Sequence, residues 1–373
     1  MQYFDELKIK CIDKLARTSE RIKDSIPHTT VNGKYDDVSN RDYCSWTASF
    51  WAGIMWQMYR ETEEAEYRTF AENIEKWIEN KLYSYEEMDH DIGFLWLLSG
   101  VENYEITGNV RSKNNSLLAA SVLSSRFNLN GRFIRAWNRT GDEGKAIIDC
   151  MMNLDLLFWA SRQASDNGFY NVAKAHADTT EKYFIREDGS VRHIVEFDTV
   201  TGEKINEYAG QGYSVGSSWT RCQAWAIYGF AQTFQNTKDN KFLKTSIKVA
   251  DYFIEEAKKN NWRVKCDFRQ PEEDLLYDTS AAAIAACGMI EIYKLTQKKD
   301  YLNSAIMLIK ICDKEFCPWN DLNDEALLNY GCEKYARPIQ LPLIYGDYYF
   351  FKAVCKLSNM KNEGYNNEYD RKN

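Results

Sequence analysis

The sequence predicts an all-α fold of the (α/α)6 barrel type, in which six helical hairpins close into a ring, with a small β-hairpin insert. Helices rich in aromatic and small residues return every 45 to 70 residues along the chain. Each alternates with a more polar helix that carries one apolar stripe, as in an outer layer, whereas a helix that is apolar all round is buried. Only five prolines occur in 373 residues, as expected of a chain dominated by helices.

The expected elements follow in order along the chain. The inner helices are expected at residues 42–60, 90–104, 147–162, 217–234, 278–295 and 343–357. The outer helices are expected at residues 3–23, 63–82, 114–126, 167–185, 240–258 and 299–313. Because such a ring is one repeat architecture, we expect a single domain over residues 1–373, with a frayed tail after about residue 358.

Two segments between the helices predict β structure. Residues 187–218 contain Asp-Gly and Thr-Gly pairs and alternating side chains, which predict a hairpin with a following loop that covers the mouth of the barrel. Residues 131–138, with the sequence GRFIRAWN, form a shorter β-like patch before the third inner helix.

Composition excludes several classes of partner. The net charge of −8 disfavours nucleic-acid binding. No run reaches the roughly 18 apolar residues of a membrane span, and the charged amphipathic N-terminal segment does not resemble a secretory signal. We therefore expect a cytoplasmic protein without membrane contact, either a monomer or a homodimer.

The ten cysteines include no CxxC pair, and most of them lie in apolar helical runs. This pattern is typical of reduced core cysteines in a cytosolic protein. Cys312 and Cys317 alone are weak evidence for a metal site, so we expect neither a metal nor a cofactor.

The third inner helix carries the main candidate for catalysis. Asp149, Asn153 and Asp155 interrupt an otherwise apolar stretch. Asp149 and Asn153 are four residues apart and therefore share one face. Burial raises the pKa of a carboxyl group toward a value suited to donating a proton near neutrality. The alternative is that Asp149 is a structural carboxylate that caps a neighbouring helix.

Polar residues recur at or near the N-terminal ends of the inner helices, where parallel helices bring them to one mouth. Helix N-termini attract anions, and Arg221 adds a formal charge, so a carboxylate ligand is expected despite the acidic net charge. Ser218, Arg221 and Trp225 share a helical face. Aromatic rings with Gln, Asn, Ser and Arg neighbours suit a sugar, although each tryptophan alone is better explained as core.

Two acids and two histidines belong to the segments that bound this mouth. Asp91 and Asp149 begin adjacent inner helices, and neighbouring acids are driven to different pKa values, as in the carboxylate pair of glycoside hydrolysis. His90 and His193 gain weight from their position at the mouth. The other two histidines, His28 and His176, are expected on the surface.

Five motifs resemble one enzyme family over nearly the whole chain. They are HDIGF from His90, RAWN from Arg135, GKAIIDCMMNLDLLFWA from Gly144, QGYSVGSSWTRCQAWAIYGF from Gln211 and LPLIYGDYYF from Leu341. The sequence thereby resembles the unsaturated glucuronyl hydrolases of glycoside hydrolase family 88. The resemblance implies a bacterial enzyme that removes the 4,5-unsaturated uronic acid left at the non-reducing end of glycosaminoglycan fragments, such as unsaturated chondroitin, hyaluronan or heparin disaccharides.

The resemblance also implies roles for individual residues. Asp149 would protonate C4 of the vinyl ether and then activate the water that adds at C5, and Asp91 would be the second acid. The residues implied in substrate binding are Trp46, His90, Trp137, His193, Gln211, Trp219, Arg221 and Trp225. Residues 333–340 would lie against the leaving sugar, where Lys334 and Arg337 would face a sulfate.

Three alternatives remain open at this level. An unsaturated rhamnogalacturonyl hydrolase would perform the same hydration on a pectin fragment. An (α/α)6 sugar epimerase would need a pair of histidine acid/bases at the mouth, where this chain has Asp149. A non-catalytic sugar-binding barrel would have no need of two buried acids.

Overall fold

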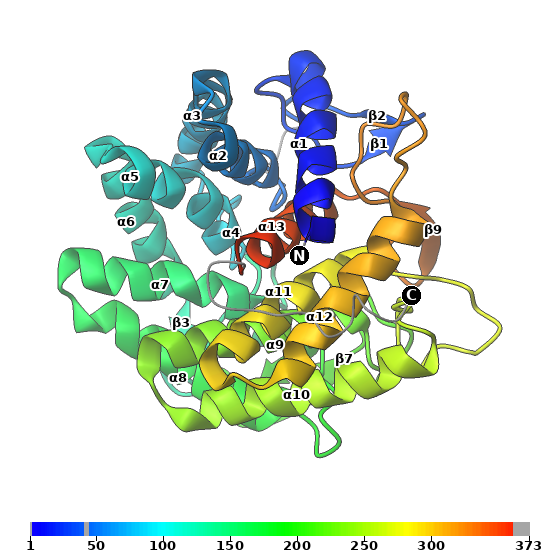
Figure 1. Cartoon of the computed structure of the whole chain (residues 1–373). Coiled ribbons are helices and arrows are strands. Elements are labelled where there is room, and N and C mark those ends of the chain that lie inside the picture. Colours follow the sequence, from blue (N-terminus) through cyan, green and yellow to red (C-terminus); the bar gives the residue numbers. More distant parts are fainter. Residues whose placement is uncertain (1, 41–44, 361–373) are drawn as a thin grey trace.

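The computed structural model describes residues 2–40 and 45–360, and within them outer and inner helices alternate around a ring (Figure 1). The outer helices are α1 (Gln2–Ile22), α3 (Ala65–Glu79), α6 (Val110–Ser125), α8 (Asn167–Phe184), α10 (Asn240–Lys259) and α12 (Lys299–Ile311). The inner helices are α2 (Phe50–Thr62), α4 (Ile92–Trp96) with α5 (Glu102–Thr107), α7 (Cys150–Ala164), α9 (Thr220–Thr237), α11 (Thr279–Thr296) and α13 (Ile344–Asn359). The predicted (α/α)6 barrel is confirmed.

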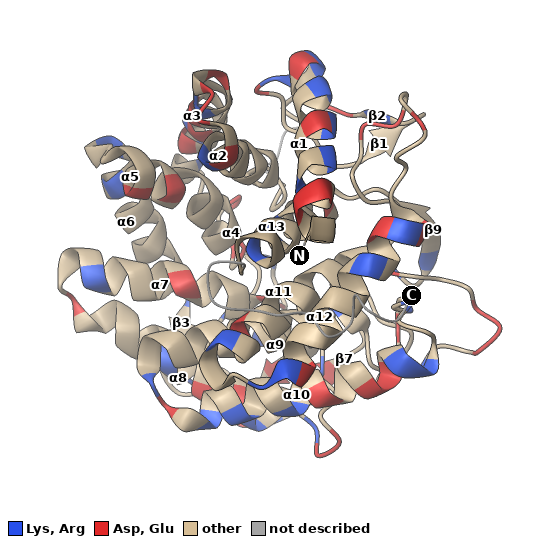
Figure 2. Ribbon diagram, in the orientation of Figure 1, with Lys and Arg blue, Asp and Glu red and all other residues tan. Residues whose placement is uncertain are grey.

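The ring closes because each inner helix packs on the next. Contacts run from α2 to the π-helical turn η2 (Leu97–Val101) that joins α4 to α5, then through α7, α9, α11 and α13, and α13 returns to α2. Every residue of α11 from Thr279 to Tyr293 is buried, whereas α10 buries one face. Charged side chains accordingly follow outer helices such as α1 and α10 (Figure 2).

The predicted boundary that differs most from the structure is the start of the first inner helix. The first inner helix was expected from Asp42, but α2 begins at Phe50, after turns that contain Trp46. Residues 42–44 of that prediction, Cys44 included, lie outside the described part. The expected fraying of the tail also concerns residues outside it, since α13 is helical to Asn359. The single domain over residues 1–373 therefore stays a prediction.

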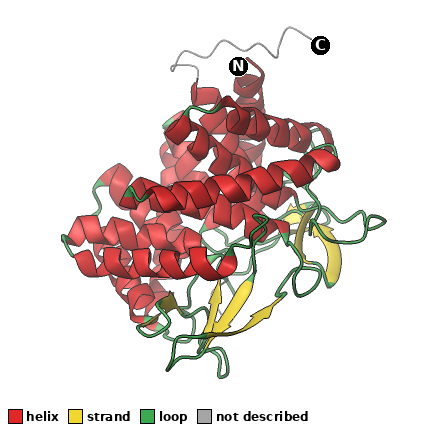
Figure 3. Ribbon diagram, turned by 90° about the horizontal axis from the view of Figure 1, so that it is seen from below, coloured by secondary structure: helices red, strands yellow, loops and turns green. Residues whose placement is uncertain are grey.

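The strands gather at one end of the helical ring (Figure 3). The predicted hairpin is confirmed as β6 (Ile194–Phe197) and β7 (Lys204–Tyr208), and β5 (Lys145–Ile147) adds a third antiparallel strand that the sequence did not predict. The β-like patch contains β4 (Phe133–Ile134), which pairs with β3 (Phe127–Asn128). Two further hairpins were missed, β1 (Thr30–Val31) with β2 (Lys34–Tyr35) and β8 (Gly331–Lys334) with β9 (Arg337–Leu341).

None of the helices in the described ranges is long and apolar enough to cross a membrane. The described cysteines are free, and eight of these nine are buried.

Candidate active site

Four consecutive inner helices begin with side chains that face the same end of the barrel. Asp91 is the N-cap residue of α4, Asp149 of α7, Trp219 of α9 and Asp278 of α11. None of these side chains accepts a capping hydrogen bond from its own helix. The carboxylates at these positions are therefore available for other contacts, although N-cap Asp residues commonly bond the first turn.

Gly93 brings the first two acids together. A Cβ atom built on Gly93 would lie 2.5 Å from the Oδ1 and Cβ atoms of Asn153. Only glycine permits this approach of α4 to α7. Asn153 Oδ1 accepts a hydrogen bond from the Phe94 amide at 2.6 Å, which fixes the carboxamide between Asp91 and Asp149. The glycine of the HDIGF motif thus positions the acid pair.

Asp149 is a partly buried acid with an unused oxygen. Its side chain is 17% exposed, and its Oδ1 atom has no hydrogen-bond partner in the described structure. The nearest basic atom to Oδ1 that forms a pair with it is His193 Nε2, 3.7 Å away. Burial raises the pKa of Asp149 to about 7. The group can therefore donate and accept a proton near neutrality.

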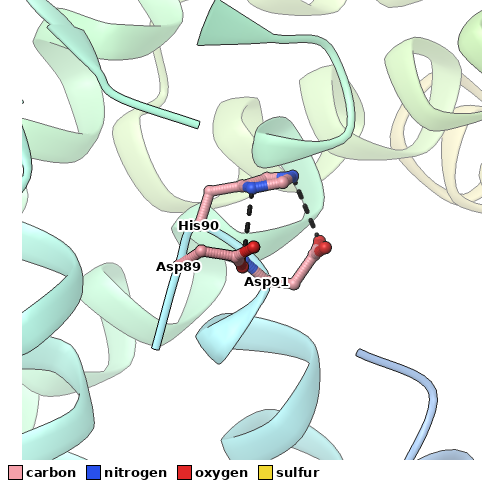
Figure 4. A group of neighbouring side chains, drawn as sticks. All are labelled: Asp89, His90 and Asp91. Carbon is pink, nitrogen blue, oxygen red and sulfur yellow. Dashed lines mark hydrogen bonds and ion pairs between the residues drawn. The ribbon is translucent and has the colours of Figure 1, made fainter. Parts of the chain in front are cut away.

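Asp91 lies against a buried histidine. His90 Nδ1 lies 2.9 Å from the carbonyl oxygen of Ala136, and His90 Nε2 lies 3.2 Å from Asp91 Oδ1 (Figure 4). Burial lowers the pKa of His90 and raises the pKa of Asp91 well above its usual range, the latter helped by the charge of Asp89. These shifts favour a neutral ring that accepts a hydrogen bond from a protonated Asp91.

The three residues Asp89, His90 and Asp91 also form a group of metal-ligand types. Both carboxylates lie on one side of the imidazole, with Asp89 beside Nδ1 and Asp91 beside Nε2 (Figure 4). Because the acids face different nitrogens and Nδ1 is bonded to a carbonyl oxygen, the group does not offer one ion a common set of lone pairs.

His193 directly precedes β6, the central strand of the three-stranded sheet. Its Nδ1 atom lies 3.1 Å from both the Ala209 carbonyl oxygen and the Gln211 amide nitrogen. Gly210 connects these two residues with φ +60°, and a Cβ atom there would lie 2.1 Å from Nδ1. The loop of residues 209–211 therefore contacts the imidazole at Nδ1. The buried Nε2 atom has no hydrogen-bond partner in the described structure.

Arg221 is buried and already has an anionic partner. Its NH1 group lies 3.2 Å from Asp278 Oδ2 and donates to the Tyr345 hydroxyl at 2.7 Å. Its NH2 group donates to the carbonyl oxygens of Cys332 and Glu333 at 3.0 and 2.9 Å. The guanidinium also lies 4.5 Å above the Trp219 ring. The ion pair with Asp278 is a contact that the sequence did not predict.

Tryptophans and other rings line the space between these groups. The Trp219 ring lies against the His193 ring, with centroids 4.5 Å apart and a tilt of 38°, and the Trp46 ring lies 4.8 Å from that of Tyr345. Phe94 connects Trp46 and Trp225, at 5.5 and 5.3 Å. The indole Nε1 atoms of Trp219 and Trp225 are buried without a hydrogen-bond partner in the described part of the chain. An orphaned buried donor is costly, so such atoms mark places where a ligand oxygen would be stabilised.

A cavity of about 590 Å³ opens beside these residues. Its walls are formed by His28, Ser45, Trp46, Glu87, Asp89, Asp91, Leu95, Trp137, Arg139, Glu333 and Arg337. Of the residues predicted from sequence, Trp46, Asp91, Trp137 and Arg337 line this cavity. His90 lies directly behind its wall, 5.8 Å from the Trp137 ring. Gln211 joins the site through its backbone contact with His193.

Both histidines that were expected on the surface were misplaced. His176 is fully buried, and its Nδ1 atom accepts a hydrogen bond from the Ile134 amide at 2.9 Å. His28 is half-buried, lines the cavity and pairs with Glu333 at 2.7 Å. The polar sequence neighbours of His28 and His176 predicted exposure. Both histidines nevertheless lie on a turn or helix face that packs against a distant segment.

The chain is similar to known proteins over most of its length. The model of Glycosyl Hydrolase Family 88 matches residues 18–238. An unsaturated glucuronyl hydrolase of Bacillus sp. (strain GL1) is 33% identical over 354 residues, which cover 92% of this chain and 93% of that protein. An unsaturated chondroitin disaccharide hydrolase of Streptococcus pneumoniae is 28% identical over 365 residues, or 93% of this chain and 91% of that protein.

A solved structure extends the likeness to three dimensions. The crystal structure of the unsaturated glucuronyl hydrolase from Bacillus sp. GL1 matches with a TM-score of 0.89 and 31% identity, and the match covers 95% of this chain and 96% of that one. The chain is therefore a glycoside hydrolase and belongs to Glycosyl Hydrolase Family 88.

Proposed function

We propose that this enzyme releases the 4,5-unsaturated uronic acid from the non-reducing end of glycosaminoglycan disaccharides and related lyase products. The observation that carries the proposal is a pair of facing buried atoms, Asp149 Oδ1 and His193 Nε2, which have no hydrogen-bond partner in the described structure. Asp149 is at the same time the acid whose pKa is raised to about 7. The names of the relatives from Bacillus and Streptococcus support the same substrate class.

In the proposed reaction, Asp149 gives its proton to C4 of the C4=C5 double bond, and a water oxygen bonds to C5. The water gives up a proton to the Asp149 carboxylate, which restores the starting acid. The product of hydration is a hemiketal at C5, which opens and expels the rest of the sugar. A carboxyl group with a pKa of about 7 fits this cycle, because it is readily present in both forms at neutral pH.

The remaining residues have proposed roles in binding. Asp91, held as a protonated acid that donates to His90, accepts a hydrogen bond at the sugar through its other oxygen without adding negative charge. The indole N–H groups of Trp219 and Trp225 and the imidazole of His193 bind oxygens of the uronate. Arg221 holds the Trp219 ring in place, since its guanidinium lies over that ring. Trp46 and Trp137 enclose the sugar ring, and Gln211 fixes the orientation of His193.

The leaving sugar is proposed to occupy the cavity of about 590 Å³. Arg139 and Arg337 on its walls suit a sulfated or otherwise anionic sugar, while Glu87, Asp89 and Glu333 limit that preference. All of these side chains come from one chain, so the proposed reaction needs no second copy and fits a monomer or a homodimer. The free cysteines favour a reducing compartment, and we place the enzyme in the bacterial cytoplasm.

The experiment is to follow the ultraviolet absorbance of the conjugated C4=C5 carboxylate in unsaturated chondroitin, hyaluronan, heparin and rhamnogalacturonan disaccharides. Loss of absorbance with a glycosaminoglycan disaccharide supports the proposal and ranks the leaving sugars. Loss with the rhamnogalacturonan disaccharide alone would favour the pectin alternative. No loss with any substrate, for folded protein, would reject the hydration reaction.

A further inference from the structure

Arg126, at the C-terminal end of α6, is a buried cation behind the candidate acid pair. The residue is 8% exposed. Its guanidinium donates four hydrogen bonds to neutral oxygens. The acceptors are Arg135 O at 3.0 Å, Met88 O at 3.1 Å, Asn138 Oδ1 at 2.6 Å and Ala136 O at 3.0 Å.

No carboxylate pairs with Arg126 among the ion pairs of the described residues. Burying a charged group without a paired counter-charge costs free energy of desolvation. A buried arginine of this kind therefore calls for a functional explanation. The four acceptors belong to the loop that precedes Asp91 and to the segment that contains Trp137. Arg126 therefore fastens together two parts of the candidate site.

One of these acceptors is shared with His90. The Ala136 carbonyl oxygen accepts from the His90 amide at 3.0 Å, from Arg126 NH2 at 3.0 Å, and lies 2.9 Å from His90 Nδ1. A carbonyl oxygen only accepts, so Nδ1 carries the hydrogen. In the neutral ring Nε2 is then bare, and it faces Asp91 Oδ1 at 3.2 Å.

The charges around His90 oppose one another. Asp89 precedes it and Asp149 begins α7, and the charges of these two acids favour an imidazolium. Burial has the largest effect and lowers the pKa of His90, and Arg126 lowers it further. The buried neighbours His176 and His193 also face this group, and the pKa of each is lowered to about 3, so neither adds a charge near neutrality.

We propose that Arg126 is a positioning residue that keeps His90 neutral, with its bare Nε2 toward Asp91, so that Asp91 is held as a carboxylic acid. The inference about His90 and Asp91 stands on contacts of this chain. Its importance for turnover rests on the proposed function. The guanidinium acts in two ways. Its NH2 group donates to the Ala136 carbonyl oxygen and fixes the position of that oxygen, and its positive charge disfavours a second proton on the imidazole.

The chain has only four histidines, so nuclear magnetic resonance of ¹⁵N-labelled and ¹³C-labelled histidine tests the proposal directly, with assignment by His90→Gln. In the unchanged protein, His90 is expected to be the Nδ1–H tautomer at pH 7. An Nε2–H tautomer or an imidazolium at pH 7 would overturn the proposal. This measurement requires neither substrate nor turnover, so its failure is distinct from a failure of the proposed reaction.

Variants then distinguish an effect of Arg126 on the protonation of His90 from a purely structural role of Arg126. Arg126→Met is expected to raise the pKa of His90 by about one unit or more, a roughly tenfold gain in proton affinity. Arg126→Lys keeps the charge and is expected to leave that pKa near its original value. The matched control is Arg135→Met, because the Arg135 side chain donates to Trp137 O at 2.6 Å and to Arg139 O on the same segment, whereas none of its hydrogen bonds in the described structure reaches the Ala136 carbonyl oxygen.

The outcomes are decisive in either direction. A shift in Arg126→Met that is absent from Arg126→Lys and Arg135→Met supports the proposal, as does a matching upward shift of the acid limb of kcat with little change in KM. An unshifted His90 in folded Arg126→Met would leave Arg126 as a structural brace and reject the proposal. If Arg126→Met does not fold, the tautomer in the unchanged protein and the titration of Arg126→Lys still decide.

Discussion

Asp149 Oδ1 and His193 Nε2 lie 3.7 Å apart, beyond hydrogen-bond distance, and neither atom has a hydrogen-bond partner in the described structure. Buried polar atoms are normally paired. Two unpaired atoms on facing side chains therefore indicate a position where a ligand atom or a water would bond to both. Asp149, one of the two residues at this position, is also the acid whose pKa is raised to about 7.

Replacing this acid tests its role. Asp149→Asn keeps the shape of the side chain but cannot transfer a proton, so kcat is expected to fall by at least about 1,000-fold. Binding should largely persist, because the tryptophan and histidine contacts remain. Loss of the C4=C5 absorbance measures turnover, and quenching of tryptophan fluorescence measures binding. Unchanged activity would remove Asp149 from the mechanism.

The raised pKa predicts how activity depends on pH. Above pH 7 the protonated fraction of Asp149 falls about tenfold per pH unit, so kcat/KM is expected to fall with the same slope if the acid form starts the reaction. A pH profile of kcat/KM on an unsaturated disaccharide checks this limb. A rate that stays constant to pH 9 would show that the reactive group is not an acid with this pKa.

The same shift predicts an effect on folding stability. The folded pKa of about 7 lies above the ordinary value of about 3.9, so the folded state holds the proton longer than the unfolded state, and stability falls between about pH 4 and pH 7. Asp149→Asn removes this loss of stability. Between pH 4 and pH 8, the free energy of unfolding of the variant should therefore rise by up to about 4 kcal/mol relative to that of the unchanged protein. Urea unfolding at the two pH values measures the difference.

Asp347 is the internal comparison for that measurement. It is fully buried, accepts hydrogen bonds from Tyr35 and the amides of Leu327 and Leu328, and also has a pKa raised to about 7 by burial. Asp347→Asn should change the dependence of stability on pH without moving the alkaline limb of kcat/KM. A shift of that limb would mean that it does not report Asp149.

The unpaired indole N–H groups predict a binding effect. Trp219→Phe keeps an aromatic ring against His193 and Arg221 but removes Nε1, so KM is expected to rise about fivefold to twentyfold, the worth of one hydrogen bond, with a smaller change in kcat. Trp56→Phe is the control, because its Nε1 atom is also buried and unpaired but lies in the middle of α2. Equal effects of both variants on KM would mean that packing, and not the donor, is responsible.

Gly93→Ala tests the contact that joins α4 to α7. Its methyl group would lie 2.5 Å from Asn153, so we expect a loss of stability of about 1–3 kcal/mol and a fall in kcat as the two acids separate. Gly346→Ala is the matched control on α13, where the nearest atom would lie at 3.4 Å. A fully active Gly93→Ala variant would show that the spacing of the acids is not critical.

The ring of helices was predictable because each pair repeats the same contrast between an apolar helix and a one-sided helix. The hairpin around His193 was predictable from its turn residues. By contrast, β5 is only Lys145 to Ile147, too short to show a period, and it exists because β6 pairs with it. Short strands that depend on a distant partner leave no local pattern.

The candidate site shows the same division. The polar residues at the helix starts pointed to Asp91, Asp149 and Arg221, because their contrast with the apolar helices is visible in sequence. The pairing of Arg221 with Asp278, and the partners of Arg126, depend on which helices become neighbours and on backbone carbonyls, which carry no side-chain signature. Cavity residues such as His28 and Arg139 come from loops whose course the sequence does not show.

The pairing of β5 with β6 makes the candidate site sensitive to single-residue insertions and deletions. Ile147 pairs with Ile194, and the Ile148 amide donates to the His193 carbonyl oxygen at 3.1 Å, so Asp149 and His193 extend from the same end of one strand pair. Side chains alternate along a strand. One residue inserted between His193 and Ile194 would turn the imidazole to the opposite face, whereas two would restore its side. Lineages of this fold should therefore tolerate length changes at the β6–β7 turn and not at the base of β6.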